Sequence, residues 1–224
     1  MINSCSTEKN GYVLGSDYVG GIAGGLGNDL AEAIRADDSV SVTTNGNYVI
    51  GNNYVGGITG INNIGIKLNN CVNNGVAASY QKYAGGIVGY NENGATIHDC
   101  ASYLSDYDNS VFNMIVDKWK ATGDYAGGIT GYNDGKIEFT KGSEAITVKS
   151  VSSIIVGNNY VGGVAGFNNV NGELDVHYTL IGGRVYGYED AVGGCFGLNA
   201  SEKVLGNELV IKPRSVEGRY YVGG

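Results

Sequence analysis

The chain has 224 residues, 42% of them hydrophobic, and its 14 basic and 22 acidic side chains give a formal net charge of -8. An acidic chain repels nucleic acid and anionic membrane surfaces, and no apolar run reaches the roughly 20 residues of a membrane span, so neither nucleic-acid binding nor membrane insertion is expected. The 39 glycines follow no three-residue period, which excludes collagen, and the hydrophobic content is too high for a disordered tract.

One motif, Tyr-Val/Ala-Gly-Gly-Ile/Val, recurs along the whole chain. Its copies begin at Tyr18, Tyr54, Tyr83, Tyr125 and Tyr160, and weaker copies begin at Ala191 and Tyr221. The starts lie 36, 29, 42, 35, 31 and 30 residues apart, which is the period of a repeat architecture. We therefore predict a single repeat domain over residues 1–224. Because the chain shows neither a signal peptide nor an anchor, we expect it to be a fragment of a longer protein.

In chain order, residues 2–13 resemble the tail of a repeat. A short helical insertion is predicted near 28–38, where Asp29 can cap and Glu32 can close a capping box. A second insertion, near 103–120, fits helical and strand spacing equally well, and we expect it to bulge from the stack. Elsewhere the alternating apolar pattern predicts short strands, at 66–68, 136–139, 145–148, 154–156, 174–178 and 209–211.

The period and the strand pattern together predict an all-β fold, a right-handed parallel β-helix (solenoid) of about six to seven rungs and about 30 Å in height. Helical repeats need long 3.6-residue patterns and leucine-rich repeats need a leucine consensus, and the sequence has neither. Each residue of such a stack lies over its equivalent in the next rung, about 4.8 Å away. Every motif position must therefore tolerate its own repetition.

Three positions of the motif receive structural roles from this argument. The aliphatic position should form an interior ladder that includes Ile22, and the glycine pair should supply φ freedom and close backbone approach at a corner. The asparagine that closes the motif can adopt the left-handed conformation and bond to its neighbour above. Whether the tyrosines face in or out is left open. The structural repeat residues are Gly56, Gly57, Ile58, Asn62, Gly85, Gly86, Ile87, Asn91, Gly127, Gly128, Ile129, Asn133, Gly162, Gly163, Val164, Asn168 and Asn199.

The cysteines follow the same repeat. Cys71 and Cys100 lie 29 residues apart, the interval between two motif copies, Cys5 shares their phase, and Cys195 replaces the motif isoleucine. We expect small apolar residues reused in a core ladder. A disulfide between Cys71 and Cys100 is the alternative that the rung spacing allows.

Catalytic, metal and cofactor sites are not expected. His98 and His177 lie 79 residues apart without a second ligand at metal spacing, so each is interpreted as a strand surface residue. The carboxylate pairs Asp37-Asp38, Asp106 with Asp108, and Glu189-Asp190 are candidates for acid/base chemistry or calcium binding. All fall in loops or insertions, where solvated charge is the default interpretation.

The second insertion contains the candidate ligand-binding residues Trp119, Tyr103 and Tyr107, because an exposed tryptophan beside tyrosines can stack on sugar rings or enter a protein partner. The alternative interpretation, which the pattern favours, is that the apolar residues of this segment pack it onto the rod.

The motif copies at Asn69–Asn91 and Cys100–Asn133 resemble GLUG-motif repeats, which occur in large bacterial surface and secreted proteins. The resemblance implies an extracellular, non-catalytic stalk or binding module of an adhesin-like protein, with a host glycan or surface protein as partner. The alternatives are a structural spacer or filament subunit that pairs end to end through rung edges at Ile2 and Gly224, and, third, a β-helix enzyme that cleaves polysaccharide.

Overall fold

The computed structural model describes residues 2–3, 7, 11–27, 39–41, 47–102, 117, 120, 122–140, 154–176, 179–181, 183–206 and 209–224. All the regular elements in these ranges are β-strands, and every strand pairing between them is parallel. The predicted helix near 28–38 and nearly all of the insertion at 103–120 lie outside the described residues, as does the strand predicted at 145–148.

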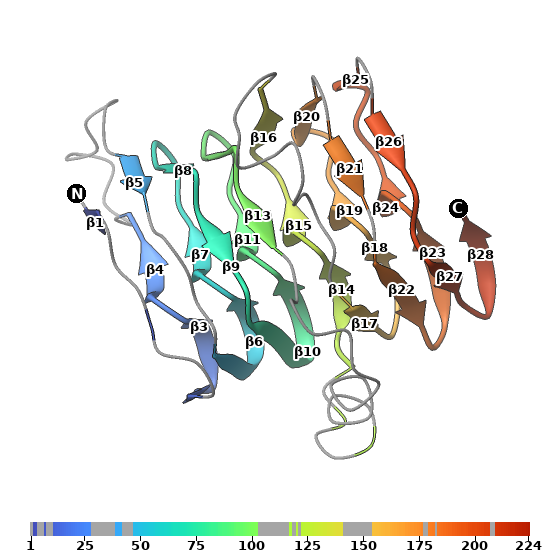
Figure 1. The fold of residues 1–224 in the computed structure, drawn as a ribbon, viewed down its shortest axis with the longest axis horizontal. Helices are drawn as coiled ribbons and strands as arrows, with labels where there is room; N and C mark the ends of the chain where they lie inside the picture. The colour runs from blue at the N-terminus through green and yellow to red at the C-terminus, as the bar shows by residue number, and fades with distance from the viewer. Residues whose placement is uncertain are drawn as a thin grey trace.

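Three long sheets carry the fold, and successive coils of the chain add one strand to each (Figure 1). The seven-stranded sheet contains β1 (Ile2–Asn3), β5 (Ser39–Ser41), β8 (Lys67–Asn69), β12 (Thr96–His98), β16 (Lys136–Phe139), β20 (Glu173–Val176) and β25 (Val204–Gly206). The six-stranded sheet contains β4 (Ala23–Leu26), β7 (Thr59–Asn62), β11 (Val88–Asn91), β15 (Thr130–Asn133), β19 (Ala165–Asn168) and β24 (Phe196–Asn199).

The eight-stranded sheet and three small sheets complete the coils. The eight-stranded sheet contains β2 (Tyr12–Leu14), β3 (Asp17–Gly20), β6 (Tyr48–Gly56), β10 (Val76–Gly85), β14 (Asp124–Gly127), β18 (Val161–Gly162), β23 (Asp190–Gly193) and β28 (Tyr220–Gly223). The small sheets pair β9 (Val72–Asn73) with β13 (Ala101–Ser102), β17 (Ile154–Gly157) with β22 (Arg184–Gly187) and β27 (Ser215–Glu217), and β21 (Thr179–Ile181) with β26 (Leu209–Ile211). This architecture is all-β and consistent with the predicted parallel β-helix; the rung number and the hand stay predictions.

The strand register places equivalent residues of successive repeats over one another, as the sequence period predicts. The interior aliphatic ladder is confirmed, because Ile58, Ile87, Ile129 and Val164 are all 0% exposed. Ile22 is partly buried and packs against the same cluster. A second fully buried column stacks Leu68, Ile97, Ile137 and Leu174 in register along the seven-stranded sheet. Burying one such side chain contributes about 1.5–3 kcal/mol, so these columns form the core of the fold.

The cysteines belong to this interior. Cys71 and Cys100 are thiols, both 0% exposed, and the backbone N–H of Cys71 donates to Cys100 Sγ at 3.3 Å. Cys195 is also a thiol and packs against the same core cluster. The expected core ladder is therefore confirmed for these three residues, and the alternative disulfide is absent from the structure. Cys5 lies outside the described residues.

The asparagines that close the motif form a continuous ladder of side-chain hydrogen bonds. Nδ2 of each donates to Oδ1 of the next: Asn62 to Asn91 at 2.9 Å, Asn91 to Asn133 at 2.9 Å, Asn133 to Asn168 at 2.7 Å and Asn168 to Asn199 at 2.8 Å. Leu26 occupies the ladder position before Asn62, and Asn62 Oδ1 is buried without a partner. The predicted bond to the neighbour is confirmed. The predicted left-handed conformation is wrong, because these asparagines lie in strands with ordinary φ.

At the corner of the motif, the residue with positive φ is the tyrosine and not the predicted glycine. The tyrosines are left-handed, with φ of 54° at Tyr54, 63° at Tyr83, 59° at Tyr125 and 56° at Tyr160, whereas no glycine of the pairs is. The glycines provide space instead. A methyl group at Gly56 would lie 1.9 Å from the carbonyl oxygen of Thr59, because the chain folds back on its own backbone there. Close approach is thus the confirmed role of the pair, and the predicted φ freedom is wrong.

We expect Asn133→Leu to destabilise the fold by about 2–4 kcal/mol. Leucine has a similar shape, but in a buried column it leaves Oδ1 of Asn168 without its donor and Nδ2 of Asn91 with only the 3.4 Å bond to the carbonyl oxygen of Lys136. Chemical denaturation measures the loss. The matched control is Asn171→Ala, which removes an exposed bond to Asp134 and should change stability by less than about 0.5 kcal/mol. Equal effects from the two substitutions would contradict the buried ladder.

We also expect the thiols of Cys71 and Cys100 to resist a thiol reagent in the folded protein and to react fully after denaturation. Burial raises the pKa of the Cys100 thiol well above its usual value, so little reactive thiolate forms. The measurement is a thiol titration with and without denaturant, using Cys71→Ala and Cys100→Ala to assign the signal. Recovery of these two residues as a disulfide would overturn this account of the interior.

Candidate binding surface: an aromatic ladder at the surface

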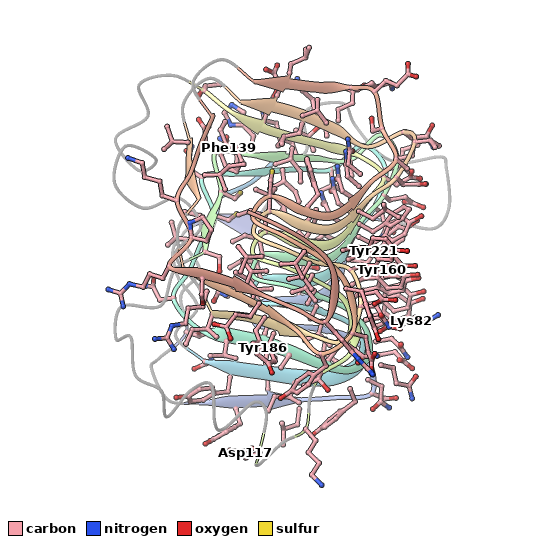
Figure 2. The ribbon with its side chains drawn as sticks, turned by 90° about the vertical axis from the view of Figure 1, so that its right-hand side faces the viewer. Lys82, Asp117, Phe139, Tyr160, Tyr186 and Tyr221 are labelled. Atoms are coloured by element: carbon pink, nitrogen blue, oxygen red, sulfur yellow. The ribbon has the colours of Figure 1, made fainter. Side chains whose placement is uncertain are left out.

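Two columns of aromatic side chains lie on the outer surface where β6, β10 and β14 turn into β7, β11 and β15. The first column, from the left-handed motif position, contains Tyr18, Tyr54, Tyr83, Tyr125 and Tyr160, with ring centroids 4.7, 5.0, 5.2 and 4.9 Å apart in that order. Three of these pairs are stacked, and the Tyr54–Tyr83 pair is tilted by 33°. The second column stacks Tyr90, Tyr132 and Phe167 at 4.9 and 5.1 Å. We call these eight residues the aromatic ladder. Figure 2 shows Tyr160 on this edge of the molecule, pointing outward.

The two columns are packed against each other as well as within themselves. Tyr83 meets Tyr90 edge to face at 5.7 Å and Tyr132 at 5.6 Å, with ring planes 80° and 85° apart. Both geometries are favourable for aromatic pairs, at about 0.5–1.5 kcal/mol each. Because each ring covers the faces of its neighbours in the column, the ladder presents mainly ring edges and phenol hydroxyls to solvent.

Polar side chains border the first column. The residue that precedes each left-handed position is polar, and these residues lie in register from strand to strand. They are Asp17, Asn53, Lys82, Asp124, Asn159 and Asp190. Amides bridge its carboxylates: Asn53 Nδ2 donates to Asp17 Oδ1 at 2.8 Å, and Asn159 Nδ2 donates to Asp124 Oδ1 at 3.0 Å. Along the second column, Asn169 Nδ2 donates to Asp134 Oδ1 at 2.7 Å. The aromatic ladder is therefore an apolar band with hydrogen-bonding margins.

The surroundings of several ladder phenols raise their pKa values. Partial burial is the largest cause for Tyr54, Tyr83, Tyr125 and Tyr132, and neighbouring tyrosines or carboxylates add to it. The pKa of Tyr90 rises most, through burial first, then through Asp134, the neighbouring phenols of Tyr132 and Tyr83, and Glu92. These phenols are thus uncharged hydrogen-bond donors at neutral pH.

His98 lies on β12, as expected for a strand residue, within a polar cluster on the seven-stranded sheet. Its Nδ1 is hydrogen-bonded to Asn69 Oδ1, and its Nε2 lies 3.7 Å from both Asp99 Oδ2 and Glu138 Oε1. Burial raises the pKa of Glu138, but hydrogen bonds from Lys136 and Lys67 outweigh burial, and the net pKa is lowered. This cluster is internally neutralised.

The other candidate residues fare differently. Glu189 Oε2 pairs with Arg219 Nη1 at 3.4 Å on the surface, while Asp190 lies in the polar margin of the aromatic ladder. Asp37, Asp38, Asp106, Asp108 and His177 lie outside the described residues. So do the ligand-binding candidates Trp119, Tyr103 and Tyr107, whose roles stay predictions. Within the part of the chain that the structure describes, no three His, Cys, Asp or Glu side chains are grouped to hold a metal ion.

The ladder tyrosines were not predicted as a site, although the sequence carries a signal for them. The residue before each ladder asparagine is aromatic in three successive copies, namely Tyr90, Tyr132 and Phe167. Alternation along the strand places that residue outside when the asparagine is inside. Alternation does not predict the side on which the motif tyrosine lies, because its left-handed backbone interrupts the strand pattern.

In a comparison with known families, residues 80–102 match the family described as the GLUG motif. This segment runs from Tyr80 in β10 to Ser102 in β13 and includes Tyr83, Tyr90 and Asn91. No curated protein and no solved structure matches the chain. Among the described residues, no helix has the length and apolar character to cross a membrane. The chain therefore contains a GLUG repeat region within an all-β array of parallel strands.

We expect the free energy of unfolding to fall as the pH rises above 10.0, the ordinary pKa of tyrosine. A phenol with a raised pKa in the folded state holds its proton more tightly there than in the unfolded chain. Its contribution to the free energy of unfolding is therefore complete below pH 10.0 and is lost as the pH rises through the folded-state pKa. Denaturation at stepped alkaline pH measures the fall. The double variant Tyr90→Phe/Tyr132→Phe places phenylalanine, the residue at Phe167, at all three positions of the second column. Its free energy of unfolding should fall less over this pH range. A pH profile identical to that of the parent would contradict the assignment of the fall to these phenols.

Proposed function

We propose that this chain is a repeat stalk or binding module of an extracellular bacterial adhesin-like protein, and that it acts without catalysis. The observation that carries the proposal is the aromatic ladder, which crosses five successive coils with its rings outward. Of the eight ladder residues, Tyr18 is exposed and the other seven are partly buried, so the rings reach the surface at their edges. A contiguous aromatic band at a protein surface marks a candidate interaction site. The matched GLUG motif supports the repeat character of such a protein.

The chemistry of the surface suggests the partner. Tyrosine hydroxyls, the amides of Asn53 and Asn159, and the carboxylates of Asp17 and Asp124 offer donors and acceptors along the margin of an apolar band. Such a mixture suits a glycan or an amphipathic protein surface, and it does not suit nucleic acid, because the margin carries acidic groups. A host glycan or host surface protein is therefore the proposed partner.

A purely structural spacer is the second candidate. The observation that favours it is the pair of continuous interior columns, the asparagine ladder and the Ile58 to Val164 ladder, which connect neighbouring coils without interruption. A stack held in this way has the rigidity that a spacer needs. The two candidates differ in whether the aromatic ladder binds anything.

The test is a screen of the purified chain on an array of glycans and host-matrix proteins, with Tyr90→Ser/Tyr132→Ser beside it. We expect the parent to bind at least one array component and the double variant to lose at least about tenfold in affinity, which corresponds to about 1.4 kcal/mol. Tyrosines are replaced because the ladder presents their ring edges and hydroxyl groups to solvent.

The matched control is Leu205→Ser, which removes an exposed apolar side chain from β25, in a sheet that does not contain the ladder. It should bind as the parent does. Circular dichroism and a thermal melt establish that all three proteins are folded. A folded parent that binds no component would support the spacer instead, and equal losses in both variants would exclude the ladder as the binding surface.

A further inference from the structure

The first column of the aromatic ladder places one oxidisable side chain, tyrosine, in register in five successive coils. From Tyr18 to Tyr160, neighbouring ring centroids lie 4.7, 5.0, 5.2 and 4.9 Å apart. The paired tyrosines are 36, 29, 42 and 35 residues apart in the sequence. Each ring contact therefore joins two different coils of the stack.

The hydroxyl ends of these rings face the surface. Figure 2 shows Tyr160 pointing outward, and Tyr18, the first ring of the column, is 49% exposed. The two ring carbons that flank the hydroxyl, the ortho carbons, lie at the same outer end of each ring. Oxidised tyrosines couple through these carbons, so the column brings together the atoms that such a bond would join.

Carboxylates beside the column make the phenols easier to oxidise. Burial raises the pKa of Tyr54 and Tyr125 most, the neighbouring phenol comes second, and the carboxylates of Asp17 and Asp124 add to the rise. A negative charge that disfavours a phenolate favours the loss of an electron from the ring, because that loss makes the ring more positive.

The rest of the chain offers an oxidant few competing side chains. The sequence contains 17 tyrosines but only two methionines and one tryptophan. The thiols of Cys71 and Cys100 are 0% exposed, and the oxidation of a thiol requires both exposure and thiolate character. Tyrosine is therefore the main oxidisable group that this protein presents at its surface.

We propose that the first column is a site of oxidative modification, at which a haem peroxidase and hydrogen peroxide join neighbouring tyrosines as dityrosine. Hydrogen peroxide takes one electron and one proton from each of two phenols and becomes two molecules of water. The two phenoxyl radicals then form a carbon–carbon bond between ortho carbons, and the two displaced ortho hydrogens return to the phenolic oxygens. The bond fastens successive coils, whether or not the aromatic ladder also binds a partner.

The test is oxidation of the dilute, folded chain by a haem peroxidase and hydrogen peroxide, followed by proteolysis and mass spectrometry of the cross-linked peptides. Each bond closes a loop of 29–42 residues, so the oxidised monomer should melt at least about 5 °C higher than the untreated protein. Oxidation in denaturant should lower the yield of the same pairs at least about tenfold, because the unfolded chain must close each loop by chance. The expected cross-links are Tyr18–Tyr54, Tyr54–Tyr83, Tyr83–Tyr125 and Tyr125–Tyr160.

A pair of matched variants tests the geometry. Tyr83→Phe keeps a ring in the column but lacks the oxygen that a phenoxyl radical needs. It should lose the two cross-links of Tyr83, to Tyr54 and Tyr125, and keep the other two. The control is Tyr80→Phe, three residues away on β10, because Tyr80 is 46% exposed and stacks on no ring among the described residues. It should leave all four cross-links unchanged.

Tyr221 serves as an internal control in every sample. It is 85% exposed, yet the residue in register before it is Ala191, which has no ring. If exposure alone determined the products, Tyr80 and Tyr221 would dominate the cross-links, and that result would overturn the proposal. A folded, oxidised protein without dityrosine, or with dityrosine only between separate molecules, would overturn it as well. The array screen is a separate measurement, so failure of this proposal would leave the binding module standing, and the reverse also holds.

Discussion

In-register parallel stacking is the constraint on which this structure depends, because it places every side chain against its own equivalents at the strand spacing. Isoleucine, asparagine and tyrosine each satisfy it differently: by aliphatic contact at Ile87, by an amide bond at Asn91 and by ring stacking at Tyr83. Carboxylates cannot stack on themselves without repulsion. Accordingly, Asp17, Asp124 and Asp190 of the outer polar column are separated by amides or lysine, so no two acids are adjacent in it.

The left-handed tyrosines connect the fold to the surface. That conformation costs an L-residue about 1–2 kcal/mol, and a stacked aromatic pair contributes about 0.5–1.5 kcal/mol, so stacking offsets much of the strain. The backbone leaves little choice, since a methyl group at Gly60 would lie 2.5 Å from the carbonyl oxygen of Tyr54. The tight corner thus turns each tyrosine outward, and repetition of the corner makes the aromatic ladder. Where Ala191 takes the same conformation, the corner persists without its ring.

The sequence period was sufficient to predict the parts of the fold that depend only on phase. Ile58, Asn133 and Cys100 were placed correctly because equivalent positions of stacked coils must coincide. Backbone conformation was beyond the pattern: glycine was the natural candidate for positive φ, yet Tyr54 holds it. The left-handed backbone at this position also interrupts strand alternation, so the pattern does not predict that the tyrosines face outward. The insertions near 28–38 and 103–120 break the period, and the structure leaves the predictions made for them untested.

The most direct test of this account is a proton–proton NOE measurement on protein labelled only in its tyrosine rings. In-register stacking predicts contacts between rings that are far apart in sequence, from Tyr54 to Tyr83, from Tyr83 to Tyr125 and from Tyr125 to Tyr160, with none from Tyr54 to Tyr125. Single Tyr→Phe variants assign each signal. The observation of this chain of contacts would establish both the stacking and the outer aromatic column. A folded protein whose tyrosine rings show no contacts with one another would contradict the strand register on which both the fold and the aromatic ladder depend.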